Sequence, residues 1–362
     1  MLVIASRPDR LGARLKNFVA AWDFAKRLGA PLLINWPPKG GVKYVASDDY
    51  DLFQLFDRTH LLSRADIAGV ETQPHRALLN THATPRTAVV SQGIRGTFND
   101  FRRQFDCIIY DSTYPYRAGY PLERVFRRHK RSQIFQDIRL NREIHEALET
   151  ISRSYRLRQA VALHIRRGDV GPLLTHAGGA RKEEQRKAHI RKRTFEFAAR
   201  YAPLEAYIAA VARYDHSQQY CIFSDDDTVR QALAHDIHGR SINIDDDINA
   251  YPLSSTQRAF VEMMTIARTK TVICAKSAFP EFAAMVGACR RIPVLDYLEP
   301  QSLLRDIETN LQDGQDIVSV YQGLADAYQT LLPGRMKAKP RIIEALGERA
   351  GEVNAAALSA AG

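Results

Sequence analysis

The sequence is poor in cysteine and lacks long hydrophobic segments. It has four cysteines, mostly inside apolar runs, and no pair has the spacing of a zinc site. Isolated thiols of this kind are typical of a reducing compartment, so we predict a cytoplasmic protein without a disulfide framework. No run of about 18 apolar residues occurs, and residues 1–6 show no charged leader, so neither a transmembrane segment nor a secretion signal is expected.

Aromatic residues are absent from the most basic central part of the chain. The formal net charge is +10, and part of this excess lies in residues 181–193, "RKEEQRKAHIRKR". Because surfaces that bind single-stranded nucleic acid use aromatic side chains on which bases stack, this composition argues against nucleic acid. A phosphorylated small ligand also fits the positive charge. A basic RNA-binding protein remains an alternative, and it would show salt-sensitive affinity for RNA.

The chain is long enough for two domains, since it has 362 residues, of which 45% are hydrophobic. Short apolar runs such as "PLLINW" and "QYCIFSD" alternate with helical patterns along both halves. This alternation predicts an α/β fold with two Rossmann-like domains, each built on a parallel sheet. The expected divisions are an N-terminal domain at 1–155, a second domain at 156–300, C-terminal helices at 301–350 and a disordered tail at 351–362.

Charged side chains follow one predicted strand in "LHIRRGDV", residues 163–170. Ligands of open α/β sheets bind at the carboxyl ends of the strands, so this position suggests an anionic ligand. Strand alternation sends His164 and Arg166 to one face and Arg167 to the other. A guanidinium can donate two parallel hydrogen bonds to a phosphate, and Asp169 can hold an arginine in place. An ion-paired turn without a ligand is the alternative.

Two further strand ends carry groups that suit a nucleotide. The carboxylates of "SDDDT", residues 224–228, could bind a metal or a diphosphate, although Asp226 or Asp227 could instead cap the next helix. Glu262 is an acid within an apolar helix face, and its carboxylate could accept the N1–H and N2–H of guanine. Ser277 lies near a helix start, where backbone N–H groups bind anions. We expect these strand ends to converge on one crevice that binds a nucleotide.

The motifs resemble those of the fucosyltransferases that include nodulation-factor and core α1,6 enzymes and, more distantly, α1,2- and protein O-fucosyltransferases. The H-x-R-R-x-D motif matches residues 164–169, and S-D-D matches residues 224–226. An acid followed about fifteen positions later by a serine turn matches Glu262 and Ser277, although the family usually has Asp at the first of these positions. The segment "NFVAAWDFAKRLGAPLLINW" is similar to the N-terminal part of the nodulation-type enzymes, and the preceding glycine loop retains Gly12 but not its second glycine.

This resemblance implies a GT-B glycosyltransferase with two Rossmann-like domains that face a cleft, in which residues 1–155 form the acceptor-side domain and residues 156–300 the domain that binds the nucleotide sugar. The implied reaction transfers fucose from GDP-fucose to a glycan or glycoconjugate with inversion, without a metal or another cofactor. Arg166 and Asp169 are the implied catalytic residues, with Arg166 at the β-phosphate. The implied nucleotide-binding residues are Arg166 together with His164 and Glu262 at the guanine, Ser277 at the phosphate, Asp225 as a support for the arginines, Arg167 and Gly12.

Other features of the reaction are less constrained by the sequence. His176, Glu183 and Glu184 are candidates for the base that activates the acceptor. A different GDP-sugar on the same fold and a non-catalytic nucleotide- or glycan-binding protein are the alternatives. We also predict that residues 174–194 are mobile and become ordered over the cleft when ligands bind.

Overall fold

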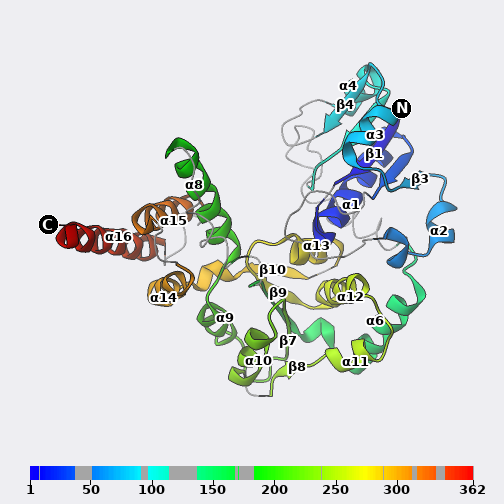
Figure 1. The fold of residues 1–362 in the computed structure, drawn as a ribbon. Helices are drawn as coiled ribbons and strands as arrows, with labels where there is room; N and C mark the ends of the chain where they lie inside the picture. Colours follow the sequence, from blue (N-terminus) through cyan, green and yellow to red (C-terminus); the bar gives the residue numbers. More distant parts are fainter. Residues whose placement is uncertain are drawn as a thin grey trace. The chain divides into compact units, whose positions relative to one another are not determined.

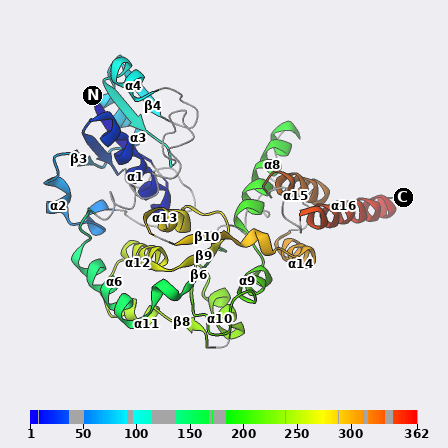
Figure 2. The ribbon, with the colours of Figure 1, turned by 180° about the vertical axis from the view of Figure 1, so that it is seen from behind.

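The computed structural model describes residues 1–7, 9–36, 51–90, 97–113, 137–167, 170, 183–237, 239–287, 289–311, 316–331 and 339–361. The chain divides into two compact units, each of which contains one five-stranded parallel sheet (Figures 1 and 2). Unit 1 comprises Met1–Arg158, Ile244–Thr269 and Ala278–Cys289, and unit 2 comprises Gln159–Asn243, Lys270–Ser277 and Arg290–Gly362.

The sheet of unit 1 has the strand order β3-β2-β1-β5-β4, and its pairings are parallel. Four of these strands coincide with apolar runs of the sequence, "MLVIAS", "PLLINW", "TAVVSQG" and "FDCIIYDS". The exception is β3, which was not predicted because Gly69 and its partly exposed neighbours weaken the apolar pattern. The strands are β1 (Leu2–Ser6), β2 (Leu32–Asn35), β3 (Ile67–Glu71), β4 (Thr87–Val90) and β5 (Cys107–Tyr110).

Helix α1 (Leu11–Leu28) is the central helix of unit 1 and is buried along most of its length. Phe18 and Trp22 lie in its core face, as their helical spacing predicts. The helix ends at Gly29, whose φ of 64° suits glycine and whose N–H bonds the carbonyls of Ala25 and Lys26. The other helices of unit 1 are η1 (Leu52–Gln54), α2 (Arg58–Leu62), α3 (His75–His82), α4 (Phe98–Gln104), α6 (Arg142–Ser154), α11 (Asp245–Asn249), α12 (Ser255–Arg268) and α13 (Ala278–Val286).

The sheet of unit 2 has the order β10-β9-β6-β7-β8, again with parallel pairings. Its strands are β6 (Val161–Ile165), β7 (Tyr220–Ser224), β8 (Ser241–Ile242), β9 (Thr271–Cys274) and β10 (Arg290–Pro293). Its helices are η2 (Leu157–Gln159, which begins in unit 1), α8 (Glu183–Arg200), α9 (Leu204–Val211), α10 (Asp227–Asp236), η4 (Val294–Tyr297), α14 (Pro300–Asn310), α15 (Ile317–Leu331) and α16 (Lys339–Ala361). The predicted α/β class, with two parallel sheets, is confirmed.

The division of the chain differs from the predicted single boundary. Helices α12 and α13 lie in unit 1, although the strand between them, β9, lies in unit 2. Packing explains this placement, because Phe260 of α12 contacts Phe56 with ring centroids 5.7 Å apart. Lys16 of α1 also forms an ion pair of 2.5 Å with Glu281 of α13. The continuous domain expected at 156–300 is therefore corrected to segments that belong to both units.

One expectation about the C-terminal half is also corrected, and the mobility of residues 174–194 stays a prediction. The tail expected to be disordered at 351–362 continues α16 as far as Ala361, which fits the high helix propensity of its alanines. The predicted mobile segment 174–194 is helical from Glu183, where α8 begins. In α8, Ile190 and Thr194 are buried, and Thr194 lies against Gly323 of α15. The rest of that segment, 174–182, falls outside the described residues.

The helices of the described residues also bear on membrane spanning. None of the helices there combines the length and the apolar character that crossing a bilayer requires.

Candidate functional site

The residues predicted from strand ends meet at the carboxyl edge of the sheet in unit 2. The strand order reverses at β6, which pairs with β7 on one side and with β9 on the other. Ile165 pairs with Ser224 of β7, and His164 pairs with Cys274 of β9. Such a reversal is where open α/β sheets bind ligands. The groups that follow these paired residues are Arg166 and Arg167 after β6, Asp225 after β7 and Ser277 after β9.

Arg167 is held by contacts within unit 2. Its backbone N–H donates to Oδ1 of Asp225 at 2.7 Å. Its guanidinium lies over the ring of Tyr201, 4.4 Å from the centroid, and its Nη1 is 3.7 Å from Oδ2 of Asp306. The side chain is only 13% exposed, so these contacts are shielded from water. Arg167 therefore links the end of β6 to α14.

Tyr201 and Asp306 form the other side of this link. The hydroxyl of Tyr201 donates to Oδ2 of Asp306 at 2.7 Å, so one carboxylate serves both Tyr201 and Arg167. Burial raises the pKa of Tyr201, which keeps the phenol protonated and able to donate. Within the described part of the chain, the buried Nε of Arg167 has no hydrogen-bond partner.

His164 lies two residues before Arg166, so strand alternation places both on the same face, where the charge of Arg166 acts on the imidazole. Burial and, second to it, the positive charge of Arg166 together lower the pKa of the His164 imidazole to about 4. The ring is therefore neutral near pH 7, with one nitrogen that donates and one that accepts. The carbonyl of His164 accepts a hydrogen bond of 2.9 Å from the hydroxyl of Tyr207 on α9. The backbone is thus held on both sides of Arg166, at His164 and at Arg167.

The two aspartates that follow β7, Asp225 and Asp226, have different roles. Asp226 caps α10, because its Oδ1 accepts the N–H groups of Thr228 at 2.9 Å and Val229 at 3.2 Å, which confirms the predicted capping role. Asp225 is exposed, and its Oδ1 accepts a hydrogen bond from the backbone N–H of Arg167. One carboxylate of this run therefore supports the helix, and its neighbour supports the turn that carries the arginines.

Ser277, Glu262 and Gly12 are distributed over both units. Ser277 is buried in unit 2, directly before α13. Glu262 is half-buried on α12 of unit 1, a helix that begins with a capping box formed by Ser254 and Gln257. Gly12 lies in α1 of unit 1. A Cβ there would stand 2.9 Å from the backbone carbonyl carbon of Ala278, so its lack of a side chain permits close packing of α1 on α13.

Several predicted residues cannot be placed. Asp169 and His176 fall outside the described residues, and Glu183 and Glu184 open α8 without a described side-chain position. The sequence analysis in turn missed Tyr201, Tyr207 and Asp306, which support the end of β6. Their signal in the sequence is weak, because tyrosines that follow or lie on amphipathic helices are common core residues.

Comparison with known proteins gives matches among solved structures alone. No protein-family model and no curated protein matches the sequence. Fucosyltransferase NodZ from Bradyrhizobium is 16% identical, with a TM-score of 0.45, over 79% of this chain and 93% of that chain. POFUT1 in complex with GDP-fucose is 14% identical, with a TM-score of 0.40, over 81% of this chain and 96% of that chain. The fold assignment therefore rests on the two strand orders of the chain itself.

Proposed function

We propose that the protein is a glycosyltransferase of the GT-B type that transfers fucose from GDP-fucose to a glycan or glycoconjugate, with inversion and without a metal. The observation that carries this proposal is the position of Arg166. It follows β6 at the strand-order reversal of unit 2, between two backbone anchors and beside the neutral His164. The matching H-x-R-R-x-D residues at 164–169 are the further support.

The chemistry of the proposed reaction suits a fixed guanidinium. When the bond between fucose and GDP breaks, negative charge grows on the β-phosphate while the sugar gains oxocarbenium character. A guanidinium already held in place stabilises that charge more in the transition state than in the ground state. The anchors at His164 and Arg167 reduce the reorganisation that Arg166 needs. Asp169 keeps its proposed role as the carboxylate that holds an arginine.

The same edge can recognise the guanine and the phosphates. A neutral imidazole at position 164 offers a donor and an acceptor to a base edge. For Glu262, on α12 of unit 1, the guanine contact is proposed from the motif alone, because its carboxylate could accept the paired N1–H and N2–H. Ser277 precedes α13, where a hydroxyl and backbone N–H groups suit a phosphate. We further propose a cytoplasmic location, because all four cysteines are free buried thiols.

Calorimetry with GDP, UDP and ADP tests the proposed nucleotide site directly. We expect GDP to bind most tightly and Arg166→Ala to weaken that binding while the variant remains folded. Transfer should fall by about 10²–10³, the usual effect of removing one preorganised donor. Arg166→Lys should also be impaired, because an ammonium cannot reproduce the planar fork. Arg213→Ala, an exposed arginine elsewhere in unit 2, is the matched control. Tighter binding of UDP or ADP, or normal turnover by Arg166→Ala, would overturn the proposal.

A non-catalytic nucleotide-binding protein is the second candidate, and two observations favour it. The guanidinium of Arg167 is occupied by Tyr201 and Asp306, and Gly12 is explained by helix packing. Fewer groups therefore remain for a donor phosphate than the motifs alone indicate. Incubation with a panel of GDP-sugars separates the candidates, since an enzyme releases GDP from one of them. GDP binding without release of GDP from any donor would favour the second candidate, and release from another GDP-sugar would change the proposed donor.

A further inference from the structure

The two strands that precede Arg166 and Ser277 stop pairing just before these residues. The parallel pairing of β6 with β9 ends at His164 and Cys274, whereas β6 continues one residue further with β7. Beyond that pair, backbone N–H and C=O groups lose their neighbouring strand and need other partners, because a buried backbone group without a hydrogen bond is costly. The groups that supply these partners fix the positions of the two strand ends.

One buried hydroxyl joins the two strand ends. Tyr207 of α9 is 1% exposed, and its hydroxyl donates to the carbonyl oxygen of His164 at 2.9 Å. The backbone of Ala275, the residue after β9, forms a hydrogen bond with the same hydroxyl. Burial raises the pKa of the Tyr207 phenol, so the hydroxyl keeps the proton that it donates. Tyr207 thus bridges the carboxyl ends of β6 and β9.

The bridge lies close to the two residues that it holds apart. Arg166 is two residues beyond His164, and Ser277 is two residues beyond Ala275. Two residues of even a fully extended chain span at most about 7 Å, so little backbone lies between each anchored group and the side chain that follows it. The position of one hydroxyl therefore bears on both Arg166 and Ser277.

The segment that leads from α8 to Tyr207 makes further contacts with both strand ends. The carbonyl of Ala199, in the last turn of α8, accepts a hydrogen bond of 3.0 Å from the N–H of Lys276, which holds the chain after β9 against α8. The ring of Tyr201 lies against the guanidinium of Arg167, after β6. Tyr201 and Tyr207 belong to the same buried hydrophobic cluster of unit 2. The bridge therefore has a rigid support.

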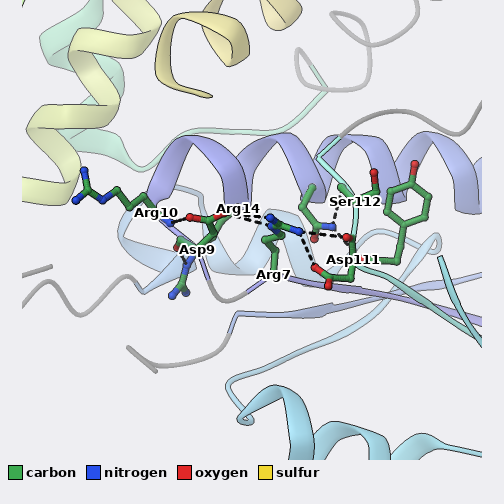
Figure 3. A network of polar contacts seen from close by, with 8 residues as sticks. Arg7, Asp9, Arg10, Arg14, Asp111 and Ser112 are labelled. Carbon is green, nitrogen blue, oxygen red and sulfur yellow. Dashed lines mark hydrogen bonds and ion pairs between the residues drawn. The ribbon is translucent and has the colours of Figure 1, made fainter. Parts of the chain in front are cut away.

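The sheet of unit 1 joins its strand ends in a different way. Its order reverses at β1, and Arg7 after β1 reaches Asp111 after β5, with Nη1 3.1 Å from Oδ1 (Figure 3). Nε and Nη2 of the same guanidinium lie 3.3 Å from Oδ2 of Asp9. There the arginine at the reversal is itself the joining group, and two carboxylates offset its charge. In unit 2 a hydroxyl from a helix joins the ends, so this task does not require the arginine that follows β6.

We propose that Tyr207 is a positioning residue of the nucleotide site, which holds Arg166 and Ser277 at the separation that a diphosphate requires. The role of these two residues as phosphate ligands rests on the proposed function. Groups that are held in advance lose less entropy on binding, and two groups at a fixed separation discriminate between ligands by length. Tyr207 therefore contributes to a preference for a nucleoside diphosphate over a monophosphate, although its burial keeps it from the ligand.

Calorimetry with GDP and GMP on the full chain tests this role. The wild type should bind GDP more tightly than GMP. Tyr207→Phe keeps the buried ring and removes the hydroxyl, and thermal melting establishes that the variant is folded. We expect the ratio of GDP to GMP affinity to fall about tenfold, with GMP affinity near that of the wild type. Tyr220→Phe is the matched control, because the hydroxyl of the buried Tyr220 bonds the carbonyl of Val211 at 3.3 Å, at the opposite end of the same sheet.

A double-mutant cycle separates positioning from a purely structural role. Arg166→Ala should lower GDP affinity less in the Tyr207→Phe background than in the wild type, because the guanidinium there is already misplaced. Equal effects of Arg166→Ala in both backgrounds would show that Tyr207 is only a core residue. Hydrogen exchange of the wild type is a measurement that needs no variant. The N–H of Ala275 should be protected, and exchange at the rate of an exposed loop would overturn the bridge.

The outcomes distinguish the role of Tyr207 from the proposed function. A ratio of GDP to GMP affinity that Tyr207→Phe leaves unchanged, with GDP binding intact, would overturn the role of Tyr207 alone. Inorganic pyrophosphate and phosphate are titrated into the same preparations. Pyrophosphate binding that depends on Tyr207, when GDP binds no more tightly than UDP, would support the positioning role and remove the assigned guanine recognition. If neither GDP nor pyrophosphate binds, both proposals are overturned.

Discussion

The protonation of His164 gives a prediction that can be worked out from the structure. Burial and the nearby Arg166 lower the pKa of this imidazole to about 4, from an ordinary value of 6.5. Between these two values the unfolded chain binds a proton that the folded protein does not. The free energy of unfolding therefore rises with pH across this interval, and His164 destabilises the folded protein as the pH falls from 6.5 towards 4.

The size of this effect follows from the difference between the two pKa values. A shift of this size corresponds to about 3 kcal/mol once the pH is below both values. At pH 5 roughly 2 kcal/mol of that loss has already occurred. His164→Gln lacks the titrating ring, so it should lose less stability than the wild type between pH 7 and pH 5. The difference between the two proteins isolates His164 from the other titrating groups.

Two measurements check the reasoning. A ¹H–¹³C NMR titration should show one histidine, absent from His164→Gln, that stays neutral until the pH is close to 4. Denaturant unfolding, followed by a probe in unit 2, should give a difference between wild type and variant that changes by about 2 kcal/mol between pH 7 and 5. A His164 resonance that titrates near 6.5 would show that the ring is solvated and not buried. The same conclusion would follow if the free energies of unfolding of the wild type and His164→Gln changed in parallel with pH.

Three further predictions concern other parts of the molecule. Transfer should survive EDTA, because Asp226 is engaged as a helix cap and Arg166 supplies positive charge; loss of activity that Mn²⁺ restores would contradict this. Gly12→Ala should lower the free energy of unfolding by about 1–3 kcal/mol, because the added Cβ would stand 2.9 Å from backbone atoms of Ala278 and Phe279. Gly347→Ala is the control and should not be destabilising, because a Cβ there meets nothing within 4 Å. Equal melting curves of the two variants would refute the packing argument. Asp306→Asn should lower the free energy of unfolding by roughly 1–3 kcal/mol, because it removes the negative charge that Arg167 and Tyr201 share. Denaturant unfolding measures this, and an unchanged midpoint would refute the stabilising role of Asp306.

The fold was largely predictable from local patterns. Buried parallel strands are continuous apolar runs, so β1, β6 and β9 could be located from composition alone. The strand β3 escaped because its residues are only partly buried and it contains Gly69. The assignment of α12 and α13 to unit 1 was not predictable, because it depends on contacts with residues such as Phe56 and Lys16, which are distant in the sequence.

The candidate site was predictable only for residues that directly follow a recognisable strand in the sequence. The apolar run before Arg166 shows which edge of the sheet the charges occupy, whereas the "SDDDT" run leaves Asp226 and Asp227 as alternative helix caps, between which the structure decides. The partners that fix the edge come from distant helices: Tyr207 from α9 and Asp306 from α14. Neither residue stands out locally, since a tyrosine on a helix usually packs in the core and an aspartate on a helix is usually solvated.

The two adjacent arginines show how one motif serves two purposes. Alternation places Arg167 on the side of Ile165, which belongs to the same hydrophobic cluster as Tyr201 and Tyr207. On that side a guanidinium is useful because its flat face stacks on Tyr201 while its edge reaches Asp306, a combination that an ammonium cannot make. Arg166 follows the opposite side and acts electrostatically on His164. Arg167 thus stabilises the strand end, and this fixed strand end gives Arg166 a defined position for its proposed role.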